Sequence, residues 1–240
     1  ISIKKYITNT RNKHTIMKKN FLLNTTLIVC CFFVKAEDLK LWYKQPATQW
    51  VEALPLGNSR LGAMVYGIPA HEEIQLNEET VWGGGPHRND NPEAQEALSE
   101  VRRLIFEGKS KEAKPIMEKK FRTPRNGMPY QTIGSLKLHF NGHENYTDYY
   151  RDLDLKKAVT TTRYKVNDVT YTRELFTSFA DNIIIMRISS DKQNALNFTA
   201  DYTSPLKHFV STKKGKLILS GKGADHEGVT GVIRLENQTF

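Results

Sequence analysis

Short strand-like runs separated by turn signals repeat along most of this sequence. Residues 135–140 alternate apolar and polar side chains as a half-buried strand does, and 158–166 do the same. Asn167-Asp168 fits a two-residue turn between 158–166 and 169–176, which predicts a hairpin. Further runs of this kind lie at 61–68, 183–188, 196–202, 216–220 and 229–235. Strands at such regular spacing bury their apolar faces by stacking sheets, so the pattern predicts a mainly β fold, a large antiparallel sandwich.

Two local patterns refine this prediction. The run at 183–188 is almost continuously apolar, which predicts a strand buried on both faces. Near residues 92–120 the period changes to that of a helix, with Asn91 as N-cap, Pro92 at the first position and Gly108 at the C-terminal end. Ser110 begins a second, shorter helical pattern that contains Pro115. We therefore expect a short helical insertion in the sandwich.

The formal charge of +9 does not indicate a nucleic-acid-binding protein. Residues 1–36 hold seven basic and no acidic residues, which leaves 28 Lys and Arg against 26 Asp and Glu in 37–240, a net charge of +2. A nearly balanced body lacks the basic surface that phosphate backbones require. We expect no nucleic-acid partner.

The basic N-terminus resembles an export signal. Met17-Lys18-Lys19-Asn20 forms a positive region, 21–34 is apolar, and 34–36 supplies small residues at the outer positions of a cleavage site. About 14 apolar residues are too few for a comfortable membrane span. We expect a signal peptide at 17–36, a secreted or periplasmic mature chain, and in 1–16 an untranslated or mis-assigned upstream segment.

Both cysteines lie inside this leader. Cys30 or Cys31 could be the acylated residue of a lipoprotein, but Val29 stands where a lipoprotein signal has a small residue, so a cleaved signal is preferred. The predicted mature chain then contains no cysteine for a disulfide, thiolate metal site or nucleophile. Beyond the signal peptide we expect no membrane association.

The stretch LNEETVWGGGPHRND at 76–90 concentrates polar and aromatic residues. Gly83-Gly84-Gly85-Pro86 has neither phosphate-loop spacing nor a following Lys-Ser, so it predicts a turn that needs positive φ. HEEIQ at 71–75 lacks the second histidine of a zinc motif, and His87 and His139 stand alone in the sequence. The sequence therefore predicts no metal and no cofactor.

Carboxylates and aromatic residues are the remaining candidates for catalysis or ligand binding. Neighbouring Glu78 and Glu79 would point to opposite faces of a strand and cannot flank one glycosidic bond. We expect the four glutamates of this region, Glu72, Glu73, Glu78 and Glu79, to form a solvated edge, although one of them could face a pocket. Aromatic residues in a sandwich are mostly core, which is our expectation for Trp42, Tyr43, Trp50, Tyr149 and Tyr150. For Trp82, beside the glycine turn, core and surface positions are equally compatible.

Five motifs occur in an order that resembles one family. They are WVEALPLGNSRLGAMVYG at 50–67, IQLNEETVWGGGP at 74–86, YQTIGSL at 130–136, YRDLDL at 150–155 and YTRELFTS at 171–178. Together they resemble the N-terminal domain of family 95 glycoside hydrolases, the inverting α-L-fucosidases and their relatives. The sequence departs from the family pattern at Ser59, where the family usually repeats glycine, and at Ser135, where it often has aspartate.

The resemblance implies a β-super-sandwich over 37–240, followed in a longer parent by an (α/α)6 catalytic barrel and a small β domain. In that family the catalytic residues belong to the barrel, so the resemblance implies no catalytic residue in this chain. The pattern stops within a strand-like stretch, and we expect the domain to continue beyond Phe240.

The resemblance also implies that Asn77, Glu78 and Trp82 border the sugar pocket or brace the barrel. The expected partners are an oligosaccharide or glycan, bound through the parent enzyme, and its own barrel domain. The alternative is a stand-alone carbohydrate-binding or interaction module.

Overall fold

The computed structural model describes residues 39–123, 125 and 127–239. The chain divides into two units, 1–39 and 40–240, and the fold below is that of the second. The predicted signal peptide, Cys30 and Cys31 lie outside the described residues. Within the described part, no helix is long and apolar enough to span a membrane.

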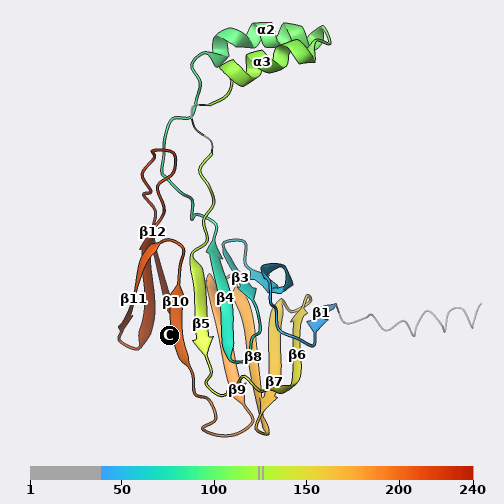
Figure 1. Cartoon of the computed structure of the whole chain (residues 1–240), viewed down its shortest axis with the longest axis vertical. Coiled ribbons are helices and arrows are strands. Elements are labelled where there is room, and N and C mark those ends of the chain that lie inside the picture. Colours follow the sequence, from blue (N-terminus) through green and yellow to red (C-terminus); the bar gives the residue numbers. More distant parts are fainter. Residues whose placement is uncertain (1–38, 124, 126, 240) are drawn as a thin grey trace, which may run out of the picture. The chain divides into compact units, whose positions relative to one another are not determined.

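Two five-stranded antiparallel sheets confirm the predicted sandwich (Figure 1). Sheet A has the order β1-β6-β7-β8-β9 and comprises β1 Lys40–Tyr43, β6 Thr147–Asp154, β7 Val159–Val166, β8 Val169–Ser178 and β9 Ile183–Ser190. Sheet B has the order β10-β5-β4-β3-β2 and comprises β2 Leu54–Gly57, β3 Leu61–Val65, β4 His71–Glu78, β5 Gly134–His139 and β10 Thr199–Thr203. A third sheet contains β11 Lys207–Lys213, β12 Lys216–Lys222 and β13 Arg234–Thr239.

One hydrophobic core joins the three sheets. Sheet B contributes Ile74 and Leu76, sheet A contributes Leu153 and Leu175, and the third sheet contributes Leu219, which is fully buried. Along β4, Ile74 and Leu76 alternate with the polar side chains of Glu73, Gln75 and Asn77, as the period of a strand requires. The alternation explains why the strand-like runs predicted the fold class correctly.

The predicted hairpin at 167–168 is confirmed, whereas the prediction for 183–188 is wrong. Asn167 and Asp168 both have positive φ, 48° and 60°, and Val166 pairs with Val169, as in a tight two-residue turn. Strand β9 is the edge strand of sheet A, and Ile183 is exposed. An apolar run does not distinguish a central strand from an edge strand, because that difference depends on strand order.

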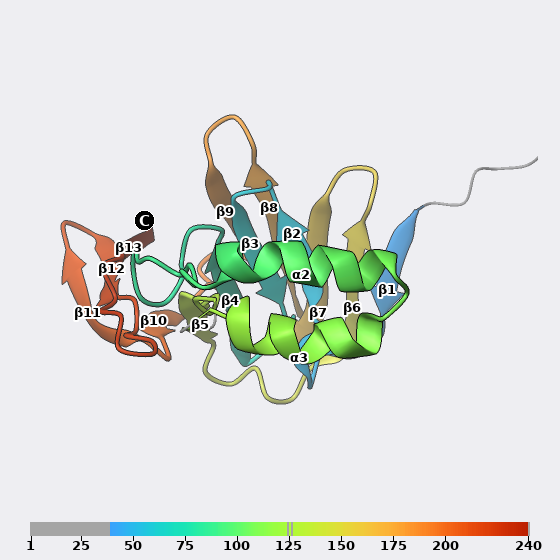
Figure 2. The same cartoon turned by 90° about the horizontal axis from the view of Figure 1, so that it is seen from above.

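The helical insertion is confirmed as a pair of helices, α2 Ala94–Phe106 and α3 Ser110–Lys120, which lie side by side (Figure 2). Asn91 Oδ1 accepts a hydrogen bond from the backbone N–H of Glu93 at 3.0 Å, just before α2. Gly108 has φ +75° after the C-terminal end of α2, as predicted. Buried Val101, Leu104 and Ala113 form a small core of their own between the helices.

The two departures from the family pattern have structural consequences. Ser59 has φ +76°, a conformation that glycine adopts with less strain, and this explains a preference for glycine there. Ser135 is buried, and its hydroxyl donates a hydrogen bond to Glu73 Oε1 at 2.8 Å. An aspartate at this position would place a second carboxylate beside Glu73.

A short 3₁₀ helix, η1 Trp50–Glu52, precedes β2. Trp50 was predicted to lie in the core, and this prediction is wrong because Trp50 is 54% exposed. The same prediction is wrong for Trp42, 56% exposed, and Tyr43, 39% exposed. Trp42 lies on β1, an edge strand of sheet A with no neighbour on its far side among the described strands.

Candidate functional site

The segment 76–90 begins in sheet B and leaves it after Glu78. Asn77 and Glu78 are the last two residues of β4 and pair with Gly62 and Leu61 of β3. As consecutive strand residues, Asn77 and Glu78 point to opposite faces. The structure thus brings Glu78 and Trp82 to the same turn, while Asn77 faces the other side of the strand.

Both oxygens of the Glu78 carboxylate accept hydrogen bonds from the protein. The carboxylate accepts hydrogen bonds from Arg60 Nε at 2.8 Å, from the backbone N–H of Thr80 at 2.8 Å and from Thr80 Oγ1 at 2.6 Å. Burial raises the pKa of Glu78, but the bonds from Thr80 and Arg60 outweigh it and the pKa lies below its usual value. An ionised carboxylate with both oxygens hydrogen-bonded does not serve as a general acid at neutral pH. It fixes the shape of the turn.

Trp82 forms an aromatic pair with Tyr130. The two rings meet edge to face with centroids 5.3 Å apart, and Trp82 is 47% exposed. The indole Nε1–H donates to the carbonyl of Glu79 at 2.9 Å, and the Tyr130 hydroxyl donates to the carbonyl of Glu78 at 2.9 Å. Both polar groups are therefore satisfied by the backbone, and the exposed ring surface is held in one orientation. Such a surface can stack on a sugar ring or pack against another domain.

The triple glycine is a packed turn. Gly84 has φ +62°, as predicted, and a Cβ there would overlap the sulfur of Met128. The N–H of Gly83 donates to the carbonyl of Pro129, and that of Gly84 to the carbonyl of Ala224, both at 2.8 Å. These two N–H groups face backbone acceptors and do not form an anion cradle. The turn ties the segment after β4 to two distant loops.

Asn77 offers an unfilled acceptor. Its Oδ1 is buried and has no hydrogen-bond donor among the residues that the structure describes, and the same holds for Gln75 Oε1 on the same face of β4. A buried amide oxygen without a donor is costly. Because the protein encloses this oxygen, it is not open to a ligand in this structure.

The prediction of a solvated edge is wrong for Glu72. This residue is 0% exposed and forms an ion pair of 2.8 Å with Arg173 of β8. Glu73 is bonded to Ser135 and paired with Lys137, and Glu79 is exposed. No residue near Glu72 in the sequence indicates this burial, because its partner Arg173 lies 101 residues away.

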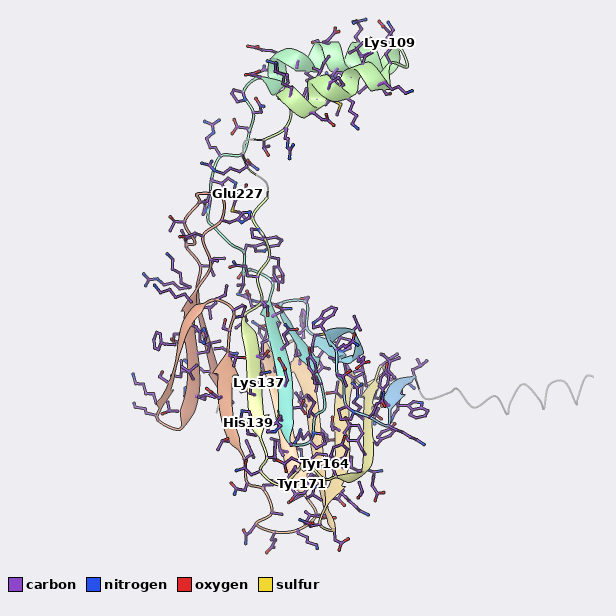
Figure 3. The ribbon with its side chains drawn as sticks, in the orientation of Figure 1. Lys109, Lys137, His139, Tyr164, Tyr171 and Glu227 are labelled. Atoms are coloured by element: carbon purple, nitrogen blue, oxygen red, sulfur yellow. The ribbon has the colours of Figure 1, made fainter. Side chains whose placement is uncertain are left out.

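The prediction that His139 stands alone is wrong, because His139 lies beside His71. His71 of β4 pairs with His139 of the neighbouring strand β5, and their Nδ1 atoms are 3.2 Å apart. Figure 3 labels His139 and Lys137 on β5. The described residues contain no group of three or more His, Cys, Asp and Glu arranged to hold a metal ion. His87 Nδ1 lies 2.9 Å from the carbonyl of Gly85 within the turn.

Sequence reasoning missed Arg60, Thr80 and Tyr130 as members of this cluster. Arg60 and Thr80 lie within the quoted motifs, but a motif does not show which side chains contact Glu78. Tyr130 comes from a segment about 50 residues farther along the chain and pairs with Trp82 through an isolated β-bridge. The sequence indicates this contact only through the family resemblance, because Trp82 and Tyr130 each belong to one of its five motifs.

Comparisons with known proteins agree on one kind of protein. A sequence model described as the N-terminal domain of glycosyl hydrolase family 65 matches residues 41–238. Alpha-L-fucosidase 2 of Arabidopsis thaliana is 38% identical over 191 residues, which cover 78% of this chain and 22% of that protein. Probable alpha-fucosidase A of Aspergillus oryzae is 31% identical over 147 residues, covering 58% of this chain and 20% of its own. The matched region thus spans about a fifth of these relatives.

Proposed function

Because this chain belongs to the family described as the glycosyl hydrolase family 65 N-terminal domain, we propose that it is the non-catalytic sandwich domain of an α-L-fucosidase-type enzyme. The parent hydrolyses α-L-fucosides of oligosaccharides or glycans with inversion, and its catalytic acid and base lie in a following (α/α)6 barrel. The names of the relatives support the reaction. The chain matches only about a fifth of the length of those relatives, which supports a catalytic site in another domain of the parent.

The role of the domain is inferred from the Glu78–Trp82 turn. An inverting glycosidase needs a protonated carboxylic acid and a carboxylate roughly 6.5–9.5 Å apart. Glu78 is ionised and both of its carboxylate oxygens are hydrogen-bonded, so it is unsuited to either task. The exposed Trp82 ring, in contrast, suits a border that contacts sugar or braces barrel loops. We propose that Asn77, Glu78 and Trp82 form this border.

Export is part of the proposal. The basic and apolar pattern at 17–36 supports a cleaved signal peptide and a secreted or periplasmic enzyme. N-terminal sequencing of protein recovered outside the cells of a producing host tests it. A start at Glu37 is expected, and recovery of uncleaved protein only from the cytoplasm would contradict export.

The decisive experiment compares variants of the full-length parent on a small aryl α-L-fucoside. Trp82→Ala is expected to lower kcat/KM by about tenfold, because a ring that borders the pocket is removed. Trp50→Ala, which deletes a tryptophan of similar exposure in η1, is the matched control and should stay within about twofold.

Two results would contradict the proposal. Turnover of the aryl fucoside by the 240-residue chain alone would mean that the sandwich is catalytic. Equal kcat/KM for wild type, Trp82→Ala and Asn77→Ala would mean that this turn does not border the pocket. Glu78→Gln serves as a separate readout: the pH profile of kcat should keep its shape, since Glu78 transfers no proton.

A further inference from the structure

A second aromatic surface lies on the outer face of sheet A, away from the core. Trp42 of β1 and Tyr150 of β6 have ring centroids 6.5 Å apart and ring planes within 19° of parallel. Trp42 pairs with Asp152, two residues from Tyr150, so both rings stand on the face opposite to buried Leu153. More than half of Trp42 is exposed to solvent.

A groove of about 440 Å³ continues from Tyr150 across β6, β7 and β8. Asp148, Arg163, Lys165 and Thr170 line it together with Tyr149 and Tyr150. A register shift between Thr147 and Tyr150 interrupts the β6–β7 ladder at this point. Such a bulge bends the strand and reorients its side chains, which opens the groove beside the rings.

The charges around the rings leave one cation without a counter-charge. Lys40 pairs with Asp152 at 3.2 Å, and Lys165 pairs with Asp148 at 3.0 Å. Arg163 lies directly across from Tyr150 in the register, and no described residue forms an ion pair or hydrogen bond with its guanidinium. A free guanidinium presents a planar fork of donors that matches a carboxylate.

We propose that this surface binds an acidic oligosaccharide, with one sugar stacked on Trp42 and Tyr150 and a neighbouring sugar's carboxylate bonded to Arg163. The apolar C–H face of a sugar matches an exposed ring, and its hydroxyls match the polar rim. Asp152, Arg163, Thr161 and Thr172 stand on the same face beside the rings, so the side chains around the rings are polar and not aliphatic. That surrounding favours a carbohydrate over an apolar protein partner.

The inference goes beyond the proposed function and does not depend on it. The Glu78–Trp82 turn follows a strand of sheet B, whereas this surface belongs to sheet A.

Calorimetric titration of the full 240-residue chain tests the proposal with two probes of equal length. A hexamer of galacturonic acid is the acidic probe, and cellohexaose is the neutral one. The acidic hexamer should bind more tightly. Trp42→Ala should weaken binding of the acidic hexamer by about tenfold, and Arg163→Gln should reduce its affinity to that of cellohexaose.

Matched variants separate specific contacts from general effects. Trp50→Ala removes an exposed tryptophan elsewhere, and Arg187→Gln removes an arginine on the same face that lies 3.8 Å from Glu174. Neither should change the affinity by more than about twofold. Unchanged thermal unfolding of Trp42→Ala and Arg163→Gln shows that they fold.

Three outcomes would overturn the proposal. They are no binding of either hexamer, equal affinity for both hexamers in the wild type, and an Arg187→Gln loss as large as that of Arg163→Gln. The last result would indicate attraction by net charge alone. A negative result in the hexamer titration does not affect the aryl-fucoside experiment on Trp82, so the two proposals are tested independently.

Discussion

Strand β4 carries a glutamate–arginine pair near each end, and the two pairs have the same length but opposite relations to solvent. Glu72 and Arg173 are 2.8 Å apart with both side chains 0% exposed. Glu78 and Arg60 are also 2.8 Å apart, with side-chain exposures of 14% and 54%. The distance between the charged groups therefore does not distinguish the structural roles of the two pairs.

The buried pair is part of a polar network that fixes the fold. Arg173 also donates to the carbonyl of Ile68 and to the hydroxyl of Tyr164, and its guanidinium lies over the ring of Phe140. Burial raises the pKa of Tyr164 to about 12. Tyr164 and Tyr171 lie close together in this network, with centroids 5.5 Å apart (Figure 3). The whole cluster is directed inward and has no surface to offer a ligand.

The exposed pair fixes a turn whose aromatic side chains face outward. Its carboxylate organises Thr80 and Arg60, while Trp82 and Tyr130 remain about half exposed. Ion pairs at a surface contribute little stability. One end of β4 therefore serves stability, and the other end presents side chains for contact.

The largest expected effect comes from Arg173→Met. Removing this partner leaves the Glu72 carboxylate buried without its counter-charge, which should lower the free energy of unfolding by about 3–5 kcal/mol. Urea unfolding followed by tryptophan fluorescence measures it. The double variant Glu72→Leu/Arg173→Met should recover part of the loss, because neither charge remains. A double variant less stable than Arg173→Met would contradict this explanation.

A smaller effect should appear as a pH dependence that originates at His143. Burial lowers the pKa of His143, and the positive charge of Arg173 lowers it further. Below the unfolded value of 6.5 the unfolded chain then binds more protons than the native one, so stability falls as the pH falls through 6.5.

Urea midpoints at pH 7 and pH 5 test this dependence. His143→Gln should reduce the difference between the two midpoints, while His208→Gln, at an exposed position, should leave it unchanged. A wild-type protein that gains stability on acidification to pH 5, with the gain lost in His143→Gln, would reverse the assigned sign.

The smallest effect on stability is expected for Arg60→Met. An exposed pair contributes about 0–1 kcal/mol, so the free energy of unfolding at pH 7 should fall by no more than that. Since the pKa of Glu78 is lowered, its contribution is present above the unfolded value of 4.5 and is lost as the pH falls through the native pKa. Arg60→Met should therefore matter less at pH 3 than at pH 7. A loss comparable with that of Arg173→Met would remove the distinction between the two ends of β4.

The fold was more predictable than the site. Alternation in 135–140 and 158–166, the Asn167-Asp168 turn and the Gly108 helix end are local signals, and each produced the expected element. Trp42 and Trp50 were expected in the core because most aromatic side chains of a sandwich are buried. Their exposure results from an edge strand and a surface turn, and local sequence specifies neither.

The sequence by itself determined β3, β5, β7, β8, β9 and β12, the helical pair, the positive φ at Gly84 and the family of the chain, because these depend on residues close in sequence or on ordered motifs. It did not predict β1, β2, β4, β6 or β11, and the strand predicted at 229–235 is β13 at 234–239. Only the tertiary structure decided which glutamate is buried and that all three tryptophans are about half exposed. Glu72 and Glu78 are six residues apart on one strand with the same side chain. Their difference arises because Arg173 meets one of them in the core and Arg60 meets the other at the surface.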